Sequence, residues 1–346
     1  MTWFVRLLVA LAGVGIAVGG AGVALGHLFL KEFTRPGVAV EPGTPQWGNW
    51  TFPDGVPEPP KEVQRAVEFQ SADGVLLRGV FWAQKHPAPT VIISHGFHLP
   101  SQHFRSVAAL EYAHGANLLL FDYRGHGQSA LTPTTCGNAE INDLVAAVDV
   151  AASQAETLRG QVYIHGFSMG AAVALLLPSH AAVAGIIADS SYARLDEMIH
   201  MLILHVLVQR TSHWSGPAQV VRPLLPALAR LMVLGGRLLF QVRYRYPLVA
   251  RPDRAISGNR VKHTERPSKM LLPPILLIHA EHDPFISLRH AHRLVTAARA
   301  AGRTIDEYYT PCAIHCGSYG QNPRRYMALL QQFMDLDHVT TSGSTL

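Results

Sequence analysis

Short apolar runs alternate with stretches of helical periodicity from about residue 61 to the end of the chain. This alternation predicts an α/β protein with a mostly parallel sheet and helices on both faces, because parallel strands need crossovers and bury both sides. Two runs, 67–70 and 75–82, flank Asp73-Gly74, which predicts an antiparallel hairpin at the start of the sheet. The later strands are expected at 90–94, 117–122, 161–165, 185–189, 274–280 and 304–310.

One connection is too long for an ordinary crossover. More than 80 residues separate the run ending at Asp189 from the run starting at Pro274, which predicts an insertion over the sheet at about 190–270. We call this insertion the cap. Its residues 210–269 contain twelve Lys or Arg but only Asp253 and Glu265 as acids. A basic cap with apolar stretches favours contact with anionic lipid, and a solvated basic surface is the alternative.

The N-terminus carries a second apolar stretch. Residues 7–30 have no formal charge and are long enough to span a bilayer, which predicts a single-pass anchor within residues 1–35. The alternative is a signal sequence that is cleaved from a secreted protein. Charges on the two sides differ too little to orient the span. Residues 36–60 hold seven prolines and are expected to be a linker, so the folded domain should occupy 61–338 with the cap inside it.

Composition narrows the classes of function. The 346 residues are 48% hydrophobic and 15% charged, with a net charge of +5, which suits one large α/β domain with insertions. The three cysteines, Cys136, Cys312 and Cys316, form neither a disulfide framework nor a Cys-x-x-Cys pattern. The sequence contains no glycine-rich phosphate loop. We therefore expect no metal, no cofactor and no nucleic acid partner.

Residues 166–170 read Gly-Phe-Ser-Met-Gly between an apolar run and a helix-favouring stretch. This is the composition of a nucleophile elbow, where a serine sits on a sharp strand-to-helix turn and glycines allow close packing. Ser168 would be exposed there, and the free N–H of Met169 at the helix start could bind a developing oxyanion. The alternative is a glycine-rich turn with an incidental serine.

A serine nucleophile needs a histidine base and a third group that orients the base. Functional groups of a parallel sheet gather on loops at the carboxyl ends of its strands. Asp283 follows the predicted strand 274–280, and His315 follows 304–310. The resulting chain order, Ser-Asp-His, is that of elbow-bearing hydrolases. Asp189, at the end of another strand, is an alternative acid.

The chain from about residue 61 resembles the α/β-hydrolase superfamily, particularly its esterase and acyl-peptidase-like members. Beyond the elbow, the segments that carry the resemblance are Ser94-His95-Gly96-Phe97, the Phe-Asp-Tyr-Arg-Gly-His-Gly-Gln-Ser run at 121–129, and the His-Ala-Glu-His-Asp-Pro-Phe-Ile run at 279–286. The resemblance implies that Ser168 is the nucleophile, Asp283 the orienting acid and His315 the base. It also implies an oxyanion hole made by the N–H groups of Phe97 and Met169.

These features predict a serine hydrolase that cleaves an acyl ester, small or lipid-like, through an acyl-enzyme intermediate. An acyl-peptidase or a thioesterase of the same fold is the nearest alternative. A scaffold protein that keeps the fold without turnover is a further one. The acyl and leaving groups depend on the shape of the cap, which its periodicity does not reveal.

Overall fold

A computed structural model describes residues 20, 22–28, 30, 31, 33–37, 56–213, 215, 222–245, 250–257 and 272–336. The predicted linker between 38 and 55 and most of the predicted anchor lie outside these residues. The chain divides into two compact units. A helical unit comprises Met1–Arg35 and Leu195–Ala250, and a sheet unit comprises Pro36–Arg194 and Arg251–Leu346.

Eight strands of the sheet unit form one sheet in the order β1-β2-β4-β3-β5-β6-β7-β8. All pairs from β4 to β8 are parallel, whereas β2 pairs antiparallel with β1 and β4. The fold class predicted from the sequence is confirmed. The strands are β1 (Gln64–Gln70), β2 (Leu76–Trp82), β3 (Ala88–Ser94), β4 (Asn117–Phe121), β5 (Thr157–Phe167), β6 (Val183–Asp189), β7 (Ile275–Ala280) and β8 (Ile305–Thr310).

The predicted hairpin is present at the edge of the sheet. Gln70 pairs with Leu76 at its closed end, and Gly74 in the turn has a φ of 81°, which suits glycine because it lacks a Cβ. β5 is longer than its apolar core suggests, since it begins at Thr157 instead of Gln161. Thr157 at the start of β5 pairs with Ala88 of β3, after a shift in register relative to the pair of Val162 with Thr90.

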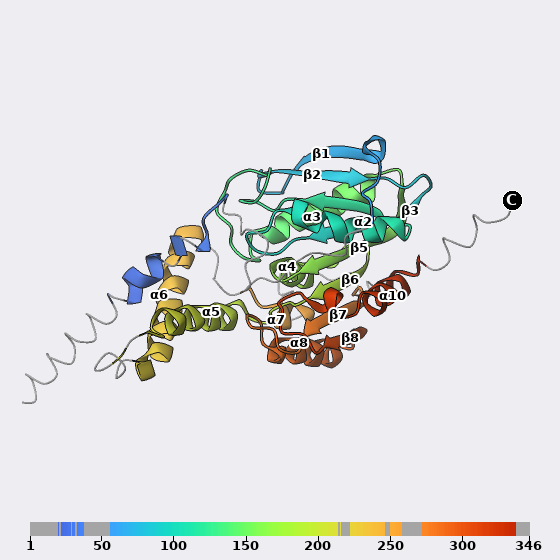
Figure 1. Ribbon diagram of the computed structural model, residues 1–346. Helices are drawn as coiled ribbons and strands as arrows, with labels where there is room; N and C mark the ends of the chain where they lie inside the picture. The colour runs from blue at the N-terminus through green and yellow to red at the C-terminus, as the bar shows by residue number, and fades with distance from the viewer. Residues whose placement is uncertain are drawn as a thin grey trace, which may run out of the picture. The chain divides into compact units, whose positions relative to one another are not determined.

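Helices cover both faces of the sheet (Figure 1). α3, α4, α7 and α8 follow one another in contact, while α2 contacts β4 and α10 contacts β6. The helices of the sheet unit are α2 (Arg105–Ala113), α3 (Glu140–Ser153), α4 (Met169–Leu176), α7 (Pro252–Ile256), α8 (Leu288–Ala300), α9 (Ser318–Gln321) and α10 (Pro323–Met334), with 3-10 turns η1 (Lys61–Val63) and η2 (Ser101–Phe104).

The central strands are buried on both sides, as continuous apolar runs predict. Every residue of β3 is buried, and Val91 and Ile93 join the cluster formed with α2 and α10, while Ile92 between them points to the other face. Each such side chain contributes about 1.5–3 kcal/mol by leaving water. Two cores therefore hold the sheet, and the carboxyl ends of β5, β7 and β8 are fixed between them.

The helical unit contains α5 (Leu195–Arg210) and α6 (Leu225–Tyr244), which contact each other, and a helical segment within residues 20–33. Both named helices fall in the interval predicted for the cap. Among the described residues, one helix, Arg222–Arg243, is long and apolar enough to cross a membrane by length and composition.

Candidate active site

β5 ends at Phe167 and α4 begins at Met169, so Ser168 occupies the turn between them. Its φ of 53° and ψ of −112° are uncommon for a residue with a Cβ. A Cβ on Gly166 would lie 2.6 Å from the backbone of Ala171, and one on Gly170 would overlap the carbonyl oxygen of Ser94. Both glycines are therefore needed for the strand and the helix to approach this closely.

Loops after β7 and β8 bring two side chains to this turn. His315 Nε2 lies 2.8 Å from Ser168 Oγ, and His315 Nδ1 lies 2.6 Å from Asp283 Oδ2. His315 and Asp283 are almost completely buried, whereas Ser168 is partly exposed. The three predicted catalytic side chains thus form one hydrogen-bonded chain, with the serine at its accessible end.

The Asp283 carboxylate is held by its own loop. Its Oδ1 accepts hydrogen bonds from the N–H groups of Phe285 and Ile286, which leaves Oδ2 for His315. Burial raises the pKa of Asp283, but the charge of His315 and its hydrogen bond outweigh burial and keep the pKa below the usual value. An ionised Asp283 favours the imidazole tautomer with a proton on Nδ1, which leaves Nε2 to accept the serine proton.

The second predicted oxyanion donor lies on the loop after β3. A Cβ on Gly96 would be 3.6 Å from Ser168 Cβ, so the segment containing Gly96 and Phe97 passes directly beside the serine. Met169, the other predicted donor, is the first residue of α4, where backbone N–H groups have no partner inside the helix. The loop and the helix start therefore flank Ser168.

A model of the alpha/beta hydrolase family matches residues 91–328, more than half of the chain. The chain belongs to the alpha/beta hydrolase family. The match includes the strand–turn–helix at Ser168 and the loops that carry Asp283 and His315.

Individual proteins extend this likeness. The chain is 27% identical to the Bacillus subtilis (strain 168) protein YqkD over 341 residues, which cover 95% of this chain and 97% of YqkD. It is 28% identical to the thiohydrolase apmlB of Arthrinium phaeospermum over 113 residues, covering 32% of this chain and 37% of that one. The structure of the Pyrococcus furiosus esterase Pf2001 matches with a TM-score of 0.59 and 22% identity, covering 86% of this chain and 97% of the esterase.

Asp189, the alternative acid, is engaged elsewhere. Its Oδ2 accepts a hydrogen bond from Tyr326 Oη at 2.8 Å, and its Oδ1 accepts one from Ser190 Oγ at 2.9 Å. Tyr326 Oη also lies 3.0 Å from His165 Nε2, whose Nδ1 faces Glu111. Asp189 therefore belongs to a buried polar chain that crosses the core between α2 and α10, and Asp283 is the carboxylate that holds His315.

Two other histidines, His95 and His126, hold the loop after β3 that carries the predicted oxyanion donor Phe97. His95 Nε2 accepts from Tyr123 N–H, and His95 Nδ1 donates to Gly96 O. His126 Nε2 accepts from the N–H of His98, next to Phe97, and its Nδ1 donates to Arg124 O. Both rings must be neutral to accept these bonds. The sequence pointed to His126 only as a member of the 121–129 run.

We expect the protein to lose stability as the pH falls from 7 to 5. Burial lowers the pKa of His95 to about 3 and also lowers that of His126, whereas histidines of the unfolded chain have a pKa of about 6.5. The unfolded state therefore takes up protons that the native state refuses, so stability is present above pH 6.5 and lost below it. His95 alone should cost about 2 kcal/mol over this range.

Urea unfolding at pH 7, 6 and 5 measures this loss. The variant His126→Gln removes one of the two imidazoles and should show a shallower dependence on pH than the parent chain. A free energy of unfolding that does not change between pH 7 and 5 would contradict the assignment of neutral rings.

Cys312 and Cys316, on either side of His315, are free but buried. Burial raises the pKa of the Cys316 thiol well above its usual value, because the charged thiolate would lose its hydration and face Asp189 and Asp283. Cys312 Sγ accepts a long contact, 3.4 Å, from the N–H of Ile314. These thiols fill space in the loop that carries the histidine, and burial disfavours a reactive thiolate at Cys316.

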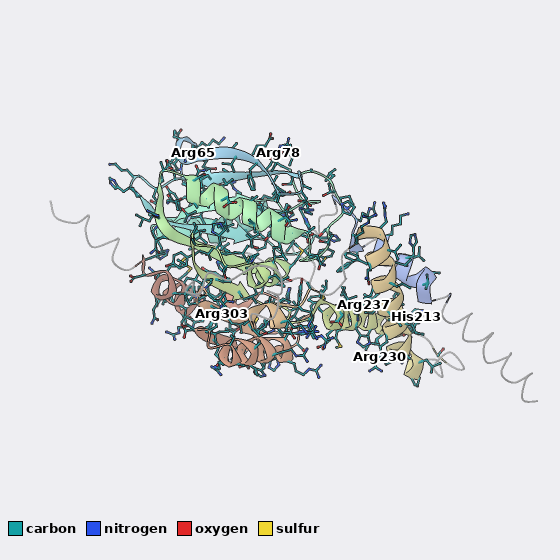
Figure 2. The ribbon with its side chains drawn as sticks, turned by 180° about the vertical axis from the view of Figure 1, so that it is seen from behind. Arg65, Arg78, His213, Arg230, Arg237 and Arg303 are labelled. Carbon is teal, nitrogen blue, oxygen red and sulfur yellow. The ribbon has the colours of Figure 1, made fainter. Side chains whose placement is uncertain are left out.

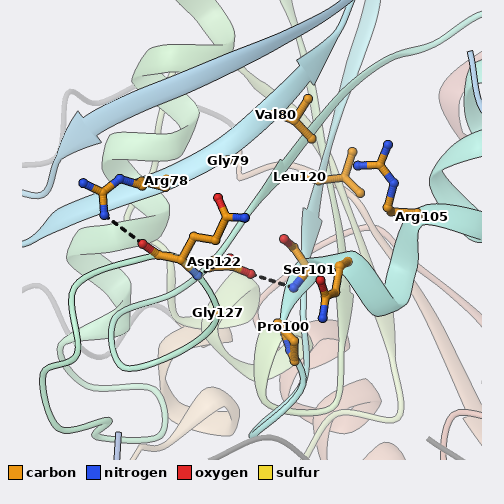
Figure 3. A pocket seen from close by; sticks show the side chains of 11 residues that line it. Arg78, Gly79, Val80, Pro100, Ser101, Arg105, Leu120, Asp122 and Gly127 are labelled. Carbon is orange, nitrogen blue, oxygen red and sulfur yellow. Dashed lines mark hydrogen bonds between the residues drawn. The ribbon is translucent and has the colours of Figure 1, made fainter. Parts of the chain in front are cut away.

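A cavity of about 440 Å³ lies elsewhere on the sheet unit, between β2, β4 and the η2 turn (Figure 3). Its charged groups are already paired, since Arg78 binds Glu68 and Arg105 binds Glu58. Asp122 accepts from backbone N–H groups on either side of it. The cavity is lined by Arg78, Gly79, Val80, Pro100, Ser101, Gln102, Arg105, Leu120, Asp122, Gly127 and Gln128. Its lining excludes Ser168 and His315, so we assign it no part in the candidate site.

Among the described residues, no group of three or more His, Cys, Asp or Glu side chains is arranged to hold a metal ion.

Proposed function

We propose that this alpha/beta hydrolase is a serine hydrolase that cleaves an acyl ester through an acyl-enzyme intermediate. The observation that carries the proposal is the continuous chain from Ser168 Oγ through His315 to Asp283, with distances of 2.8 and 2.6 Å. A serine at a strained turn, an imidazole within reach and a carboxylate on its far side are the parts that nucleophilic acyl transfer requires.

In this mechanism His315 Nε2 takes the proton of Ser168 as Oγ attacks the acyl carbon. Asp283 stabilises the imidazolium that forms, and it stays ionised throughout. The N–H groups of Phe97 and Met169 bind the oxyanion of the tetrahedral intermediate. His315 then gives its proton to the leaving alcohol, and a water molecule, activated by the same imidazole, releases the acid and restores Ser168.

Two alternatives share this site. A thioesterase is favoured by the likeness of 113 residues to a protein named a thiohydrolase, and an acyl-peptidase would use the same groups on an amide. The esterase, the thioesterase and the acyl-peptidase differ in the leaving group, which the residues around Ser168 do not specify. A scaffold without turnover would have no use for the strained backbone at Ser168, so we place this possibility last.

Labelling with a fluorophosphonate probe, followed by hydrolysis of matched esters, thioesters and amides of graded acyl length, tests the proposal. We expect one labelled serine per chain and faster turnover of esters than of the matching thioesters and amides. A folded protein that neither reacts with the probe nor cleaves any of these substrates would contradict the proposal. Preference for the thioester series would select the thioesterase alternative.

We further propose that residues 7–30 attach the chain to a membrane. The support is the uncharged length of this stretch, since most of it lies outside the described residues. The mass of the mature chain distinguishes an anchor, which is retained, from a cleaved signal, which is lost.

A further inference from the structure

Exposed apolar side chains are concentrated on the helical unit. Among the described residues, twelve large hydrophobic side chains are exposed, and nine of them belong to this smaller unit. Contiguous exposed apolar surface marks a site for lipid or for another macromolecule. The nine are Val23, Leu28, Met201, Val206, Val208, Leu224, Leu234, Leu238 and Val242.

α6 is apolar on two sides. Ala229, Val233 and Phe240 form a buried stripe. Leu234 and Leu238, one turn apart on another side, are 62% and 58% exposed. A surface helix of a globular protein normally has one apolar stripe, so the second stripe of α6 calls for an apolar partner.

Gly22 and Gly26 of the apolar N-terminal stretch lie against this same helix. A Cβ on Gly26 would lie 2.6 Å from the backbone N of Gly236, and one on Gly235 would lie 2.7 Å from the carbonyl oxygen of Gly22. Glycines thus let two helix backbones approach closely, a form of packing that is common within membranes. The uncharged residues 7–19 lead directly into the segment that lies against α6, so a bilayer that takes up this stretch also meets α6.

The charges of α6 select the kind of surface. The sequence from Arg222 to Arg245 holds five arginines and no acidic residue. Arg237 lies 3.7 Å from Asp196 of α5, whereas Arg230 is exposed one turn before Leu234 on the same side of the helix. Figure 2 labels Arg230 and Arg237 along α6. An arginine beside an apolar stripe can lay its alkyl stem on lipid chains and reach phosphate headgroups.

Arg230 and Arg237 also determine how α6 is oriented relative to the bilayer. Each arginine near the middle of a spanning helix costs about 2.5–3.5 kcal/mol on insertion scales, so crossing the bilayer is unfavourable for α6 despite its length. A helix with an apolar stripe flanked by arginines is stable in the plane of the interface. A second copy packed in parallel on this stripe would bring Arg230 close to its own equivalent, which disfavours that arrangement.

We propose that α5 and α6, together with the N-terminal helix, form a face that docks in the plane of an anionic lipid surface. Leu234 and Leu238 enter the acyl-chain boundary, and Arg230 binds the headgroups. This inference concerns the helical unit and does not depend on the chemistry proposed for Ser168.

Depth measurements on the full chain test the docking face. The predicted anchor would bring any variant to vesicles, so the readout must be local to α6. Leu234→Cys and Leu238→Cys are each labelled with an environment-sensitive fluorophore, and Leu158→Cys on β5 is the control at an exposed apolar position of the sheet unit. The native cysteines are buried, which restricts labelling to the new site.

On phosphatidylglycerol vesicles that carry an acyl-chain quencher, we expect the probes at 234 and 238 to be quenched at least two-fold more than the probe at 158. Equal quenching at the three positions would overturn the proposal. A probe that is shielded from solvent but insensitive to the lipid quencher, with energy transfer between chains, would indicate that a second copy of the chain covers this stripe. That result would also overturn the proposal.

The charge contribution needs its own control. Arg230→Gln should at least halve the quenching at position 238 on anionic vesicles, and added salt should act in the same direction because it screens the headgroups. Arg159→Gln, an exposed arginine of the sheet unit, should leave the quenching unchanged. Equal quenching on phosphatidylcholine and phosphatidylglycerol, with no effect of Arg230→Gln, would overturn the recognition of anionic lipid.

Discussion

Replacing Ser168 by alanine is expected to abolish labelling by fluorophosphonates and to lower kcat for esters by at least about 10⁴-fold. The reason is that Ser168 Oγ is the nucleophilic atom in the proposed mechanism, and it lies 2.8 Å from His315 Nε2. Active-site titration and steady-state kinetics on a soluble ester measure the effect. The loss should come without unfolding, because the Ser168 side chain is partly exposed and buries no apolar surface.

Matched variants make this result specific. Ser153→Ala changes an exposed serine at the end of α3 and should retain full activity. His315→Ala should lose about as much activity as Ser168→Ala, and the double variant should lose little more, since the two side chains act as one unit. Substantial ester hydrolysis by a purified, folded Ser168→Ala protein would show that Ser168 is not the nucleophile.

The second large effect on turnover is expected when Asp283, the carboxylate that orients His315, is replaced. Asp283→Asn should lower kcat by about 10⁴-fold while the protein stays folded, because an amide in place of the carboxylate disturbs the tautomer of His315 and no longer stabilises the imidazolium. Asp189→Asn is the matched control, with an expected loss of less than about tenfold. Its carboxylate receives hydrogen bonds from Tyr326 and Ser190, so it supports the core beside the site.

The carboxyl groups of Asp189 and Asp283 should change the free energy of unfolding with pH in opposite directions, because their pKa values are shifted in opposite directions. Burial raises the pKa of Asp189, so ionisation of this group at neutral pH costs stability, which is greatest below the pKa of the unfolded chain and falls as pH rises through the native pKa. Asp283 has a lowered pKa, so its contribution is present above the unfolded pKa and lost in acid. If matched kinetics found Asp189→Asn more damaged than Asp283→Asn, with both variants folded, the acid would lie at the end of β6.

Some features of the site were within reach of sequence reasoning because they are local. The turn at 166–170 follows from its glycines, since a Cβ at Gly166 or Gly170 meets backbone atoms only a few residues away or on the adjacent strand. Asp283 and His315 were candidates because each follows an apolar run, and strand ends in a parallel sheet gather at one edge. The helical contacts of residues 20–33 could not be foreseen, since an uncharged stretch fits lipid and protein equally well.

The order of strands and helices along the chain, the hairpin at Asp73-Gly74 and the position of the elbow could all be predicted from the sequence, because periodicity and turn chemistry act over a few residues. The role of each buried polar group, in contrast, depends on partners that are distant in the chain. Asp189 and Tyr326 are 137 positions apart in the chain, and His126 meets His98 across 28 positions. Such partners depend on how the strands are ordered in the sheet and on which face each side chain occupies, and no local pattern encodes either.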